Sequence, residues 1–213
     1  MEVFINKIHY PVKCLGNGVR LGIWFQGCTI HCQGCINPDT WEFKAERRIV
    51  VSEFLKFLDK YREHKVDGVT ITGGEPFDQP TALLEILKYL PRLTQGDIFV
   101  YSGYKFAYLK KRFQDVLKHI DVLVSEPYVE AEGDELIWRG SDNQKIHLLS
   151  EKAKEIYPKE INKMKFEGRR MQFSVVGNDV YMIGIPARSD LDRLYEIMRE
   201  RGLVRANEKP ENC

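Results

Sequence analysis

The sequence predicts an α/β protein with a mostly parallel sheet that is curled into a partial (βα) barrel and followed by a C-terminal hairpin and helix. Two observations support this prediction. Short apolar runs alternate with longer segments whose apolar residues recur at helical spacing, which is typical of βαβ units. Glycine and proline stand where one segment passes into the next. Right-handed crossovers between the strands would then curl the sheet.

The predicted strands are short segments, rich in apolar and β-branched residues, that have clear ends. Residues 21–26 end at Gly27, and residues 67–72 are broken by Gly73 and Gly74. Two more runs of this kind lie at 98–101 and 120–124. We therefore expect these runs to form the central strands.

The segments between these strands carry apolar residues on one helical face. Ser52 is expected to cap a helix that reaches about residue 64. Pro80 suits the first turn of a second helix, because the missing N–H has no partner there in any case, and Pro91 ends that helix. Residues 104–117 form the third predicted helix.

The chain after residue 150 has a different character. More than half of the residues at 151–170 are charged, and we expect a solvated helix or linker there rather than a surface that docks a partner. Runs at 171–176 and 180–185 flank Gly177-Asn178-Asp179, which is a hairpin signature.

The last part of the chain predicts one more helix. Ser189 is expected to cap it, Gly202 to stop it, and the polar tail 205–213 to be disordered. We therefore divide the chain into a core domain, residues 1–150, and a second part, residues 151–213, that packs on the core.

Composition excludes several classes of function. The 32 basic and 31 acidic residues give a net charge of +1, so the whole molecule has no field that would attract nucleic acid or an anionic membrane. The first residues lack the pattern of a signal peptide, and no apolar run approaches the roughly 20 residues that span a bilayer. We expect a cytoplasmic protein, without nucleic-acid or membrane partners.

Three of the five cysteines, Cys28, Cys32 and Cys35, fall within eight residues. Such short spacings allow three thiolates to reach one inorganic centre, and a disulfide framework rarely has this pattern. Iron–sulfur clusters favour thiolate ligands, normally four, so three would leave one iron open. His31 could instead complete a Cys3His zinc site, which is the alternative from these residues alone.

A second motif, Gly73-Gly74-Glu75-Pro76, follows a predicted parallel strand. Ligands bind at the carboxyl ends of such strands. Glycines without a Cβ allow a ligand to approach the backbone, and Glu75 and free carbonyls can accept hydrogen bonds from an ammonium group. For the two glycines alone, a tight turn into the next helix would explain the motif equally well.

Together, the three cysteines and this turn resemble the radical S-adenosylmethionine superfamily. The resemblance implies that Cys28, Cys32 and Cys35 hold a [4Fe–4S] cluster and that residues 73–76 receive the amino group of the methionine moiety. Reductive cleavage of S-adenosylmethionine would then release methionine and a 5′-deoxyadenosyl radical. Gly34 stands where the superfamily usually has an aromatic residue near the adenine, which implies contacts at Gly34 and Ile36.

Further residues resemble one branch of that superfamily, the activating proteins of anaerobic ribonucleoside-triphosphate reductases. The resemblance covers about residues 1–150 and rests on the cysteine motif and on three later stretches: residues 101–104, 121–124 and 136–144. It implies that the radical removes a hydrogen from a glycine Cα of the reductase, with a flavodoxin- or ferredoxin-type electron donor.

Two serines at predicted strand ends are candidate cofactor contacts. Ser102 could equally be a capping residue. Ser125 begins Ser125-Glu126-Pro127, where the family commonly has Asp-Gly-Pro. Residues 139–144 resemble a stretch that is characteristic of the family, and the sequence assigns these residues no chemical role.

Two alternative functions remain open from the sequence. A radical enzyme that acts on a small molecule or peptide, as the 7-deazaguanine-forming enzymes do, would use the same cofactors. A zinc-stabilised binding module would use the cysteines and His31 without catalysis.

Overall fold

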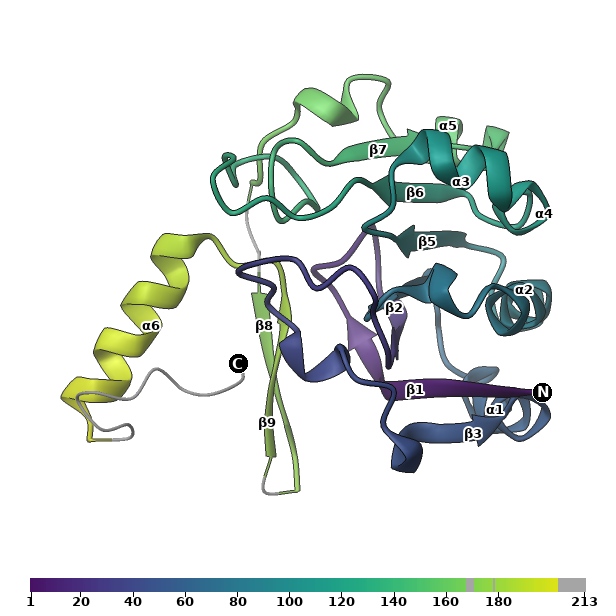
Figure 1. The fold of residues 1–213 in the computed structure, drawn as a ribbon, viewed down its shortest axis with the longest axis horizontal. Helices are drawn as coiled ribbons and strands as arrows, with labels where there is room; N and C mark the ends of the chain where they lie inside the picture. Colours follow the sequence, from purple (N-terminus) through teal and green to yellow (C-terminus); the bar gives the residue numbers. More distant parts are fainter. Residues whose placement is uncertain (168–170, 178, 203–213) are drawn as a thin grey trace.

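The computed structural model describes residues 1–167, 171–177 and 179–202 (Figure 1). Its centre is a seven-stranded sheet with the strand order β3-β1-β2-β4-β5-β6-β7. The strands are β1 (Glu2–Val12), β2 (Arg20–Phe25), β3 (Arg48–Val50), β4 (Gly68–Gly73), β5 (Asp97–Tyr101), β6 (Val122–Ser125) and β7 (Lys145–Leu148).

The middle of the sheet is parallel and its margins are antiparallel. Strands β2, β4, β5 and β6 pair in parallel in that order. On one side β1 pairs antiparallel with β2 and β3, and on the other β7 pairs antiparallel with β6. Within the described residues β3 and β7 are open edges, so the sheet does not close into a barrel.

The four parallel strands lie where the apolar runs predict them, and helices cover one face of their sheet. These helices are α1 (Val51–Leu58), α2 (Pro80–Tyr89), α3 (Phe106–Arg112) and α4 (Gln114–Leu117). Their apolar side chains share a core with one set of alternating strand residues, for example Ile23, Ile71 and Val100. This is the main core of the molecule.

Two predicted helix features are wrong in detail. Ser52 does not cap α1, which begins at Val51 with Val50 at the N-cap position. The single helix predicted over 104–117 is divided into α3 and α4, because Phe113 leaves the helical conformation (φ −131°). Its ring packs against Phe77, with the ring centroids 5.4 Å apart.

The charged segment, in its described part (residues 151–167), is only partly solvated. It contains α5 (Glu151–Ile156), which Ser150 caps by accepting a hydrogen bond from the Ala153 N–H (3.1 Å). Ala153, Tyr157 and Ile161 are buried against Phe99, Val122 and Val124 on the second face of the sheet. The segment therefore covers that face despite its charge.

The predicted hairpin is confirmed as β8 (Met171–Val176) and β9 (Asp179–Gly184). Ile183 packs with Val12 and Trp24, while Gln172 accepts from the Lys13 N–H (2.7 Å) and so fastens the hairpin to β1. The paired residues Val175 and Val180 stay exposed.

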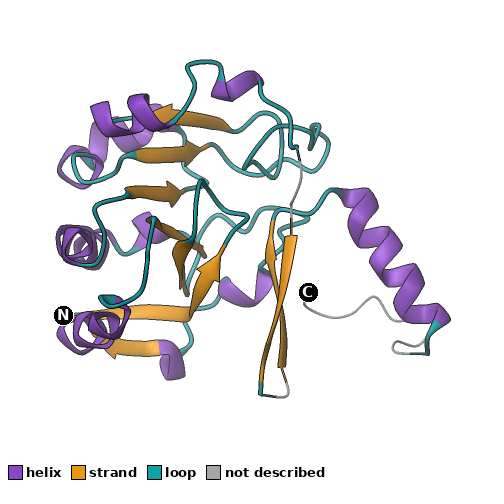
Figure 2. Ribbon diagram, turned by 180° about the vertical axis from the view of Figure 1, so that it is seen from behind, coloured by secondary structure: helices purple, strands orange, loops and turns teal. Residues whose placement is uncertain are grey.

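Helix α6 (Arg188–Glu200) follows the hairpin and stands away from the core (Figure 2). Ser189 does not cap it. Ala187 is the N-cap residue, and the Asp190 carboxylate accepts a hydrogen bond from the Ala187 N–H (3.1 Å). The predicted tail 205–213 lies outside the described residues.

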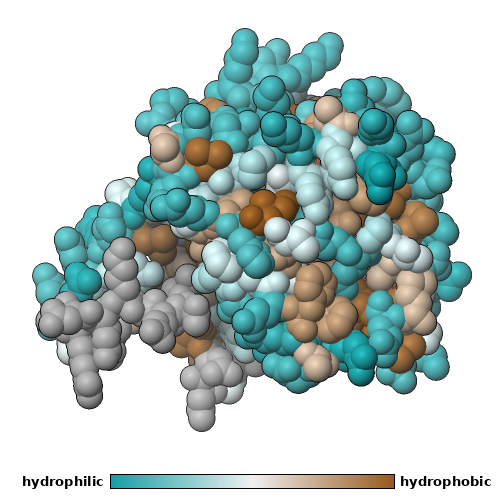
Figure 3. Space-filling model, in the orientation of Figure 1, coloured by the Kyte–Doolittle hydropathy of each residue, from teal (hydrophilic) through white to brown (hydrophobic). Residues whose placement is uncertain are grey.

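The surface in the orientation of Figure 1 is largely hydrophilic, with apolar side chains in small groups (Figure 3). In the described part of the chain, no helix has both the length and the apolar character needed to span a bilayer.

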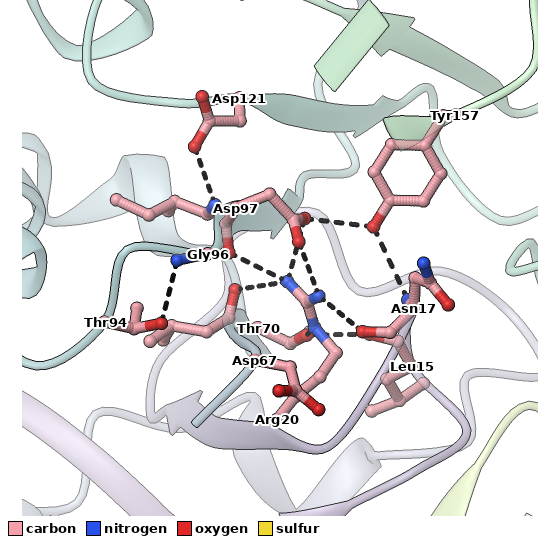
Figure 4. Close-up of polar contacts among 12 residues, drawn as sticks. Leu15, Asn17, Arg20, Asp67, Thr70, Thr94, Gly96, Asp97, Asp121 and Tyr157 are labelled. Carbon is pink, nitrogen blue, oxygen red and sulfur yellow. Dashed lines mark hydrogen bonds and ion pairs between the residues drawn. The ribbon is translucent and has the colours of Figure 1, made fainter. Parts of the chain in front are cut away.

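A buried ion pair ties the parallel strands together near their amino ends (Figure 4). Arg20 is fully buried and its guanidinium reaches both carboxylate oxygens of Asp97, at 2.8 and 3.0 Å. It also donates to Thr70 Oγ1 (2.7 Å), and the Tyr157 hydroxyl donates to Asp97 (3.0 Å). Strands β2, β4 and β5 and the segment after α5 therefore share one polar network.

We predict that Arg20→Met lowers the free energy of unfolding by about 3–5 kcal/mol, because the Asp97 carboxylate would stay buried without its partner. Arg48→Met is the matched control, since Arg48 forms an exposed pair with Glu2 and such a pair contributes about 1 kcal/mol or less. Urea unfolding followed by circular dichroism measures both. Equal losses in the two variants would contradict the role given to the Arg20 network.

Candidate functional site

The predicted site residues meet at the carboxyl-terminal end of the sheet, because they follow or end four neighbouring parallel strands. The cysteine loop follows β2, the Gly73–Gly74 turn follows β4, Ser102 follows β5, and Ser125 ends β6. Parallel strands have their carboxyl ends at the same edge of a sheet. The structure therefore brings together motifs that are far apart in the sequence.

The cysteine loop leaves β2 and is closed at its base by backbone hydrogen bonds. The Gly27 N–H donates to the Thr40 carbonyl (2.7 Å), and the Cys28 N–H donates to the Trp41 carbonyl (2.9 Å). The buried Gln26 side chain donates to the carbonyls of Asp39 (2.9 Å) and Glu42. The loop thus has a fixed base.

The three cysteines on this loop are partly buried. The Cys35 sulfur accepts a hydrogen bond from the Asn37 N–H (3.4 Å). Burial raises the pKa of the Cys28 and Cys32 thiols, and nearby backbone N–H groups, chiefly that of His31 for Cys28 and that of Tyr128 for Cys32, oppose the shift.

This donor set fits an iron–sulfur cluster. The cysteines of the described chain form no disulfide, so the three thiols are available. Within the same residues no three His, Cys, Asp or Glu side chains converge as ligands of a single metal ion. In a [4Fe–4S] cube each thiolate binds a different iron, so such convergence is not required. Coordination would deprotonate the thiols despite their raised pKa.

The turn after β4 packs directly against the cysteine loop. The Gly74 N–H donates to the Phe25 carbonyl and the Glu75 N–H to the Gly27 carbonyl, both at 2.8 Å. A Cβ at Gly74 would lie 2.1 Å from the Gly27 oxygen. Glycine is therefore required here by the chain's own packing, whatever ligand the turn binds.

The Glu75 side chain points into the protein and joins this turn to the next one. Its carboxylate is buried and accepts hydrogen bonds from the Phe77 N–H (3.0 Å), the Ser102 hydroxyl (2.9 Å) and the Gly103 N–H (2.7 Å). Burial raises the pKa of Glu75 to about 8, against the effect of these donors. The carboxyl group of Glu75 and the hydroxyl of Ser102 are therefore hydrogen-bond partners of each other. Pro76, the next residue after Glu75, is also buried.

Ser125 is fully buried, and its hydroxyl lies 2.9 Å from Nε2 of His147. The His147 ring stacks on Phe106, with the centroids 3.7 Å apart. Burial lowers the pKa of His147. Glu126, which follows Ser125, has φ +82°, a conformation that favours glycine. A cofactor contact of Ser125 stays a prediction.

On the cysteine loop, Gly34 lies between Cys32 and Cys35, and Ile36 follows Cys35. Gly34 has φ +73°, and a Cβ there would lie 2.9 Å from the carboxyl carbon of Glu130. Ile36 is partly buried. An open hollow of about 430 Å³ lies between Gln33 of the cysteine loop and residues 128–131, which line it.

Sequence reasoning missed a group that supports the cysteine loop. Asp78 accepts from the Thr29 N–H (2.7 Å) and from the Tyr104 hydroxyl (2.6 Å). Tyr104 belongs to a family stretch, but nothing in the sequence pairs it with Asp78. His31 stacks on Trp41, with the centroids 4.8 Å apart.

Comparison with known proteins agrees with this site. Residues 14–147 match a family model described as a 4Fe-4S single cluster domain. The anaerobic ribonucleoside-triphosphate reductase-activating protein of Haemophilus influenzae is 33% identical over 148 residues, which are 65% of this chain and 94% of that protein. The protein of the same name from Escherichia coli K12 is 32% identical over 149 residues, 66% of this chain and 96% of that protein. The one from phage T4 is 29% identical over 143 residues, 64% and 89% of the two chains. This chain therefore belongs to the family of the anaerobic ribonucleoside-triphosphate reductase-activating proteins, and it has a 4Fe-4S single cluster domain.

Proposed function

We propose that this protein cleaves S-adenosylmethionine reductively at a [4Fe–4S] cluster and thereby generates a glycyl radical on an anaerobic ribonucleotide reductase. The observation that carries the proposal is that the glycine turn at residues 73–76 is hydrogen-bonded to the start of the cysteine loop. Hydrogen bonds from Gly74 and Glu75 to Phe25 and Gly27 place the glycine turn beside the loop of the three cysteines. A centre held by that loop would have the backbone of the turn next to it.

Cys28, Cys32 and Cys35 would hold three irons and leave the fourth open. The cluster and S-adenosylmethionine, when bound, would supply the chemistry: reductive cleavage of a C–S bond to methionine and a 5′-deoxyadenosyl radical, which would take a hydrogen atom from a glycine Cα and leave as 5′-deoxyadenosine. The protein would contribute the ligands, their orientation and the exclusion of water.

The backbone of Gly73 and Gly74, together with Glu75 and Pro76, would receive the methionine amino group. Because protein donors already occupy the Glu75 carboxylate, we assign this contact to backbone carbonyls of the turn. Glu75 would then act by holding the turn in place.

The remaining cofactor contacts are assigned to residues that lie at the same carboxyl-terminal end of the sheet. Gly34 and Ile36 would face the adenine side. Ser102 and Ser125 lie at the next strand ends, and direct contact would need their hydroxyls to leave Glu75 and His147. A curl of the sheet toward a partial barrel would bring these ends around one centre.

A flavodoxin- or ferredoxin-type protein would supply the electron, in the cytoplasm. The related proteins named above favour a reductase as the partner over a small-molecule substrate. The match to a 4Fe–4S domain likewise favours iron over zinc.

We expect reduced, iron-loaded protein to produce the doublet of a glycyl radical when it is mixed with S-adenosylmethionine and an anaerobic ribonucleotide reductase. Electron paramagnetic resonance measures the doublet. Cys32→Ala should abolish both the doublet and the bound iron, because two thiolates cannot anchor the cube. Cys14→Ala is the control, since Cys14 is buried against Ile183 outside the loop.

Absence of the doublet with an active partner would remove the proposed function. A doublet from Cys32→Ala at the wild-type level would remove the assigned ligation.

Gly74→Ala should reduce the iron content strongly and destabilise the fold by about 1–3 kcal/mol, because its Cβ would collide with the Gly27 backbone next to Cys28. Gly103→Ala is the matched control. The nearest atom to its Cβ would be the end of the Ile30 side chain (2.7 Å), which can turn away, and a Glu75 carboxylate oxygen would lie at 3.7 Å, an ordinary contact distance. Iron analysis and thermal unfolding compare the two, and wild-type iron content in Gly74→Ala would contradict the packing argument.

A further inference from the structure

One side chain from the segment after β4 holds the first half of the cysteine loop, residues 28–32. Asp78 ends the short 3₁₀ helix Pro76–Asp78, which follows the glycine turn. One of its carboxylate oxygens accepts a hydrogen bond from the Thr29 N–H (2.7 Å), and the other accepts from the Thr29 hydroxyl (3.1 Å). Thr29 directly follows Cys28. A single carboxylate therefore links the residue after the first candidate ligand to the glycine turn.

The backbone around Asp78 is itself fixed. The Asp78 N–H donates to the Glu75 carbonyl (3.1 Å). The next residue, Gln79, donates through Nε2 to the Gln26 carbonyl (2.9 Å), directly after β2. Its Oε1 accepts from the Phe4 N–H of β1 (2.7 Å). The carboxylate that holds Thr29 is therefore attached to the sheet.

Tyr104 orients this carboxylate from the loop after β5. Its hydroxyl donates to the same oxygen of Asp78 that receives the Thr29 hydroxyl, at 2.6 Å. The Tyr104 N–H donates to the Ser102 hydroxyl (3.1 Å), and the Tyr104 carbonyl accepts from the Glu126 N–H (3.1 Å). Since its backbone is bonded on both sides, Tyr104 presents the hydroxyl from a fixed position.

The residue after Thr29 packs against the same loop after β5. A Cβ on Gly103 would lie 2.7 Å from Cδ1 of Ile30, so the Ile30 side chain lies against this glycine. The Gly103 N–H in turn donates to the Glu75 carboxyl group (2.7 Å). Polar contacts at Thr29 and an apolar contact at Ile30 thus join the cysteine loop to the segments after β4 and β5.

These contacts act on the stretch between the first two candidate ligands. Only residues 29–31 separate Cys28 from Cys32. The first two of them have the contacts just described, and the third, His31, stacks on Trp41 (ring centroids 4.8 Å apart). The path of the chain from one ligand to the next is therefore set by contacts with side chains outside this stretch.

We propose that Asp78 and Tyr104 are positioning residues that hold the first half of the cysteine loop in register with the glycine turn at residues 73–76. The proposal rests on the proposed function, in which Cys28 and Cys32 bind the cluster and the turn binds the methionine amino group. The placement of S-adenosylmethionine at the cluster then depends on how firmly these two segments are joined.

The test is a titration of the reduced, iron-loaded protein with S-adenosylmethionine, followed by electron paramagnetic resonance, because a ligand at the open iron changes the spectrum of the cluster. Asp78→Ala removes all three side-chain hydrogen bonds, and Tyr104→Phe removes only the hydroxyl that orients the carboxylate. Tyr108→Phe is the matched control. Tyr108 is exposed, its ring lies 5.0 Å from that of Tyr104, and its hydroxyl takes no part in these bonds.

We expect the concentration of S-adenosylmethionine that gives half of the spectral change to rise about tenfold in Asp78→Ala and about threefold in Tyr104→Phe. Tenfold corresponds to about 1.4 kcal/mol, which is near the contribution of a hydrogen bond to a charged group. Tyr108→Phe should keep the wild-type value. Iron analysis and thermal unfolding of each variant accompany the titration, because a merely structural role would lower Tm without changing this concentration in the folded, iron-loaded protein.

Wild-type half-saturation in both Asp78→Ala and Tyr104→Phe would overturn this inference, while a glycyl radical formed by the wild-type protein would leave the proposed function standing. Loss of iron from both variants with a native circular dichroism spectrum would also overturn it, because the two residues would then serve ligation rather than placement. If Asp78→Ala does not fold, Tyr104→Phe alone decides in the same way. Iron-loaded wild-type protein whose spectrum S-adenosylmethionine leaves unchanged would overturn both proposals.

Discussion

The site depends on the parallel pairing of β2 with β4 up to their carboxyl ends. Phe25 stands beside Gly73 in the register, and the ladder continues beyond the strands through the bonds of Gly74 to Phe25 and of Glu75 to Gly27. The cysteine loop and the glycine turn are therefore joined by main-chain hydrogen bonds. Main-chain bonds of this kind fix two loops more closely than contacts between flexible side chains do. They also leave no space for a Cβ at Gly74.

Buried polar groups cross-link the parallel strands at both ends. Near the amino ends, Arg20 connects β2 with Thr70 of β4 and Asp97 of β5. At the carboxyl ends, Glu75 connects the turn after β4 with Ser102 after β5. Both buried groups have several hydrogen-bond partners, as buried polar groups require. The strands thus form a rigid platform, and the cysteine loop extends from it.

The sequence predicts the centre of the fold better than its margins. The four parallel strands are mostly buried, so each contains a short run of mainly apolar and β-branched residues. Strand β1 mixes polar and apolar residues and contains Pro11, and β3 has only three residues, so neither has a clear signal. The helix starts at Ser52 and Ser189 were wrong because a serine signals a cap only when its side chain faces the first turn.

The candidate site, like the fold, is predicted by the sequence only in part. Three cysteines close together and a glycine pair after a strand are local patterns, and strand order alone predicts that they meet. The partners of Ser102 and Ser125 are Glu75 and His147, which lie 27 and 22 residues away. No spacing rule in the sequence connects such pairs.

The central claim is that three cysteine ligands leave one iron open for S-adenosylmethionine. Mössbauer spectroscopy of protein reconstituted with ⁵⁷Fe tests it most directly. We predict that addition of S-adenosylmethionine changes the isomer shift of about one quarter of the iron, the share of one site in a four-iron cluster. A spectrum that stays the same when S-adenosylmethionine is added at saturating concentration would contradict the account.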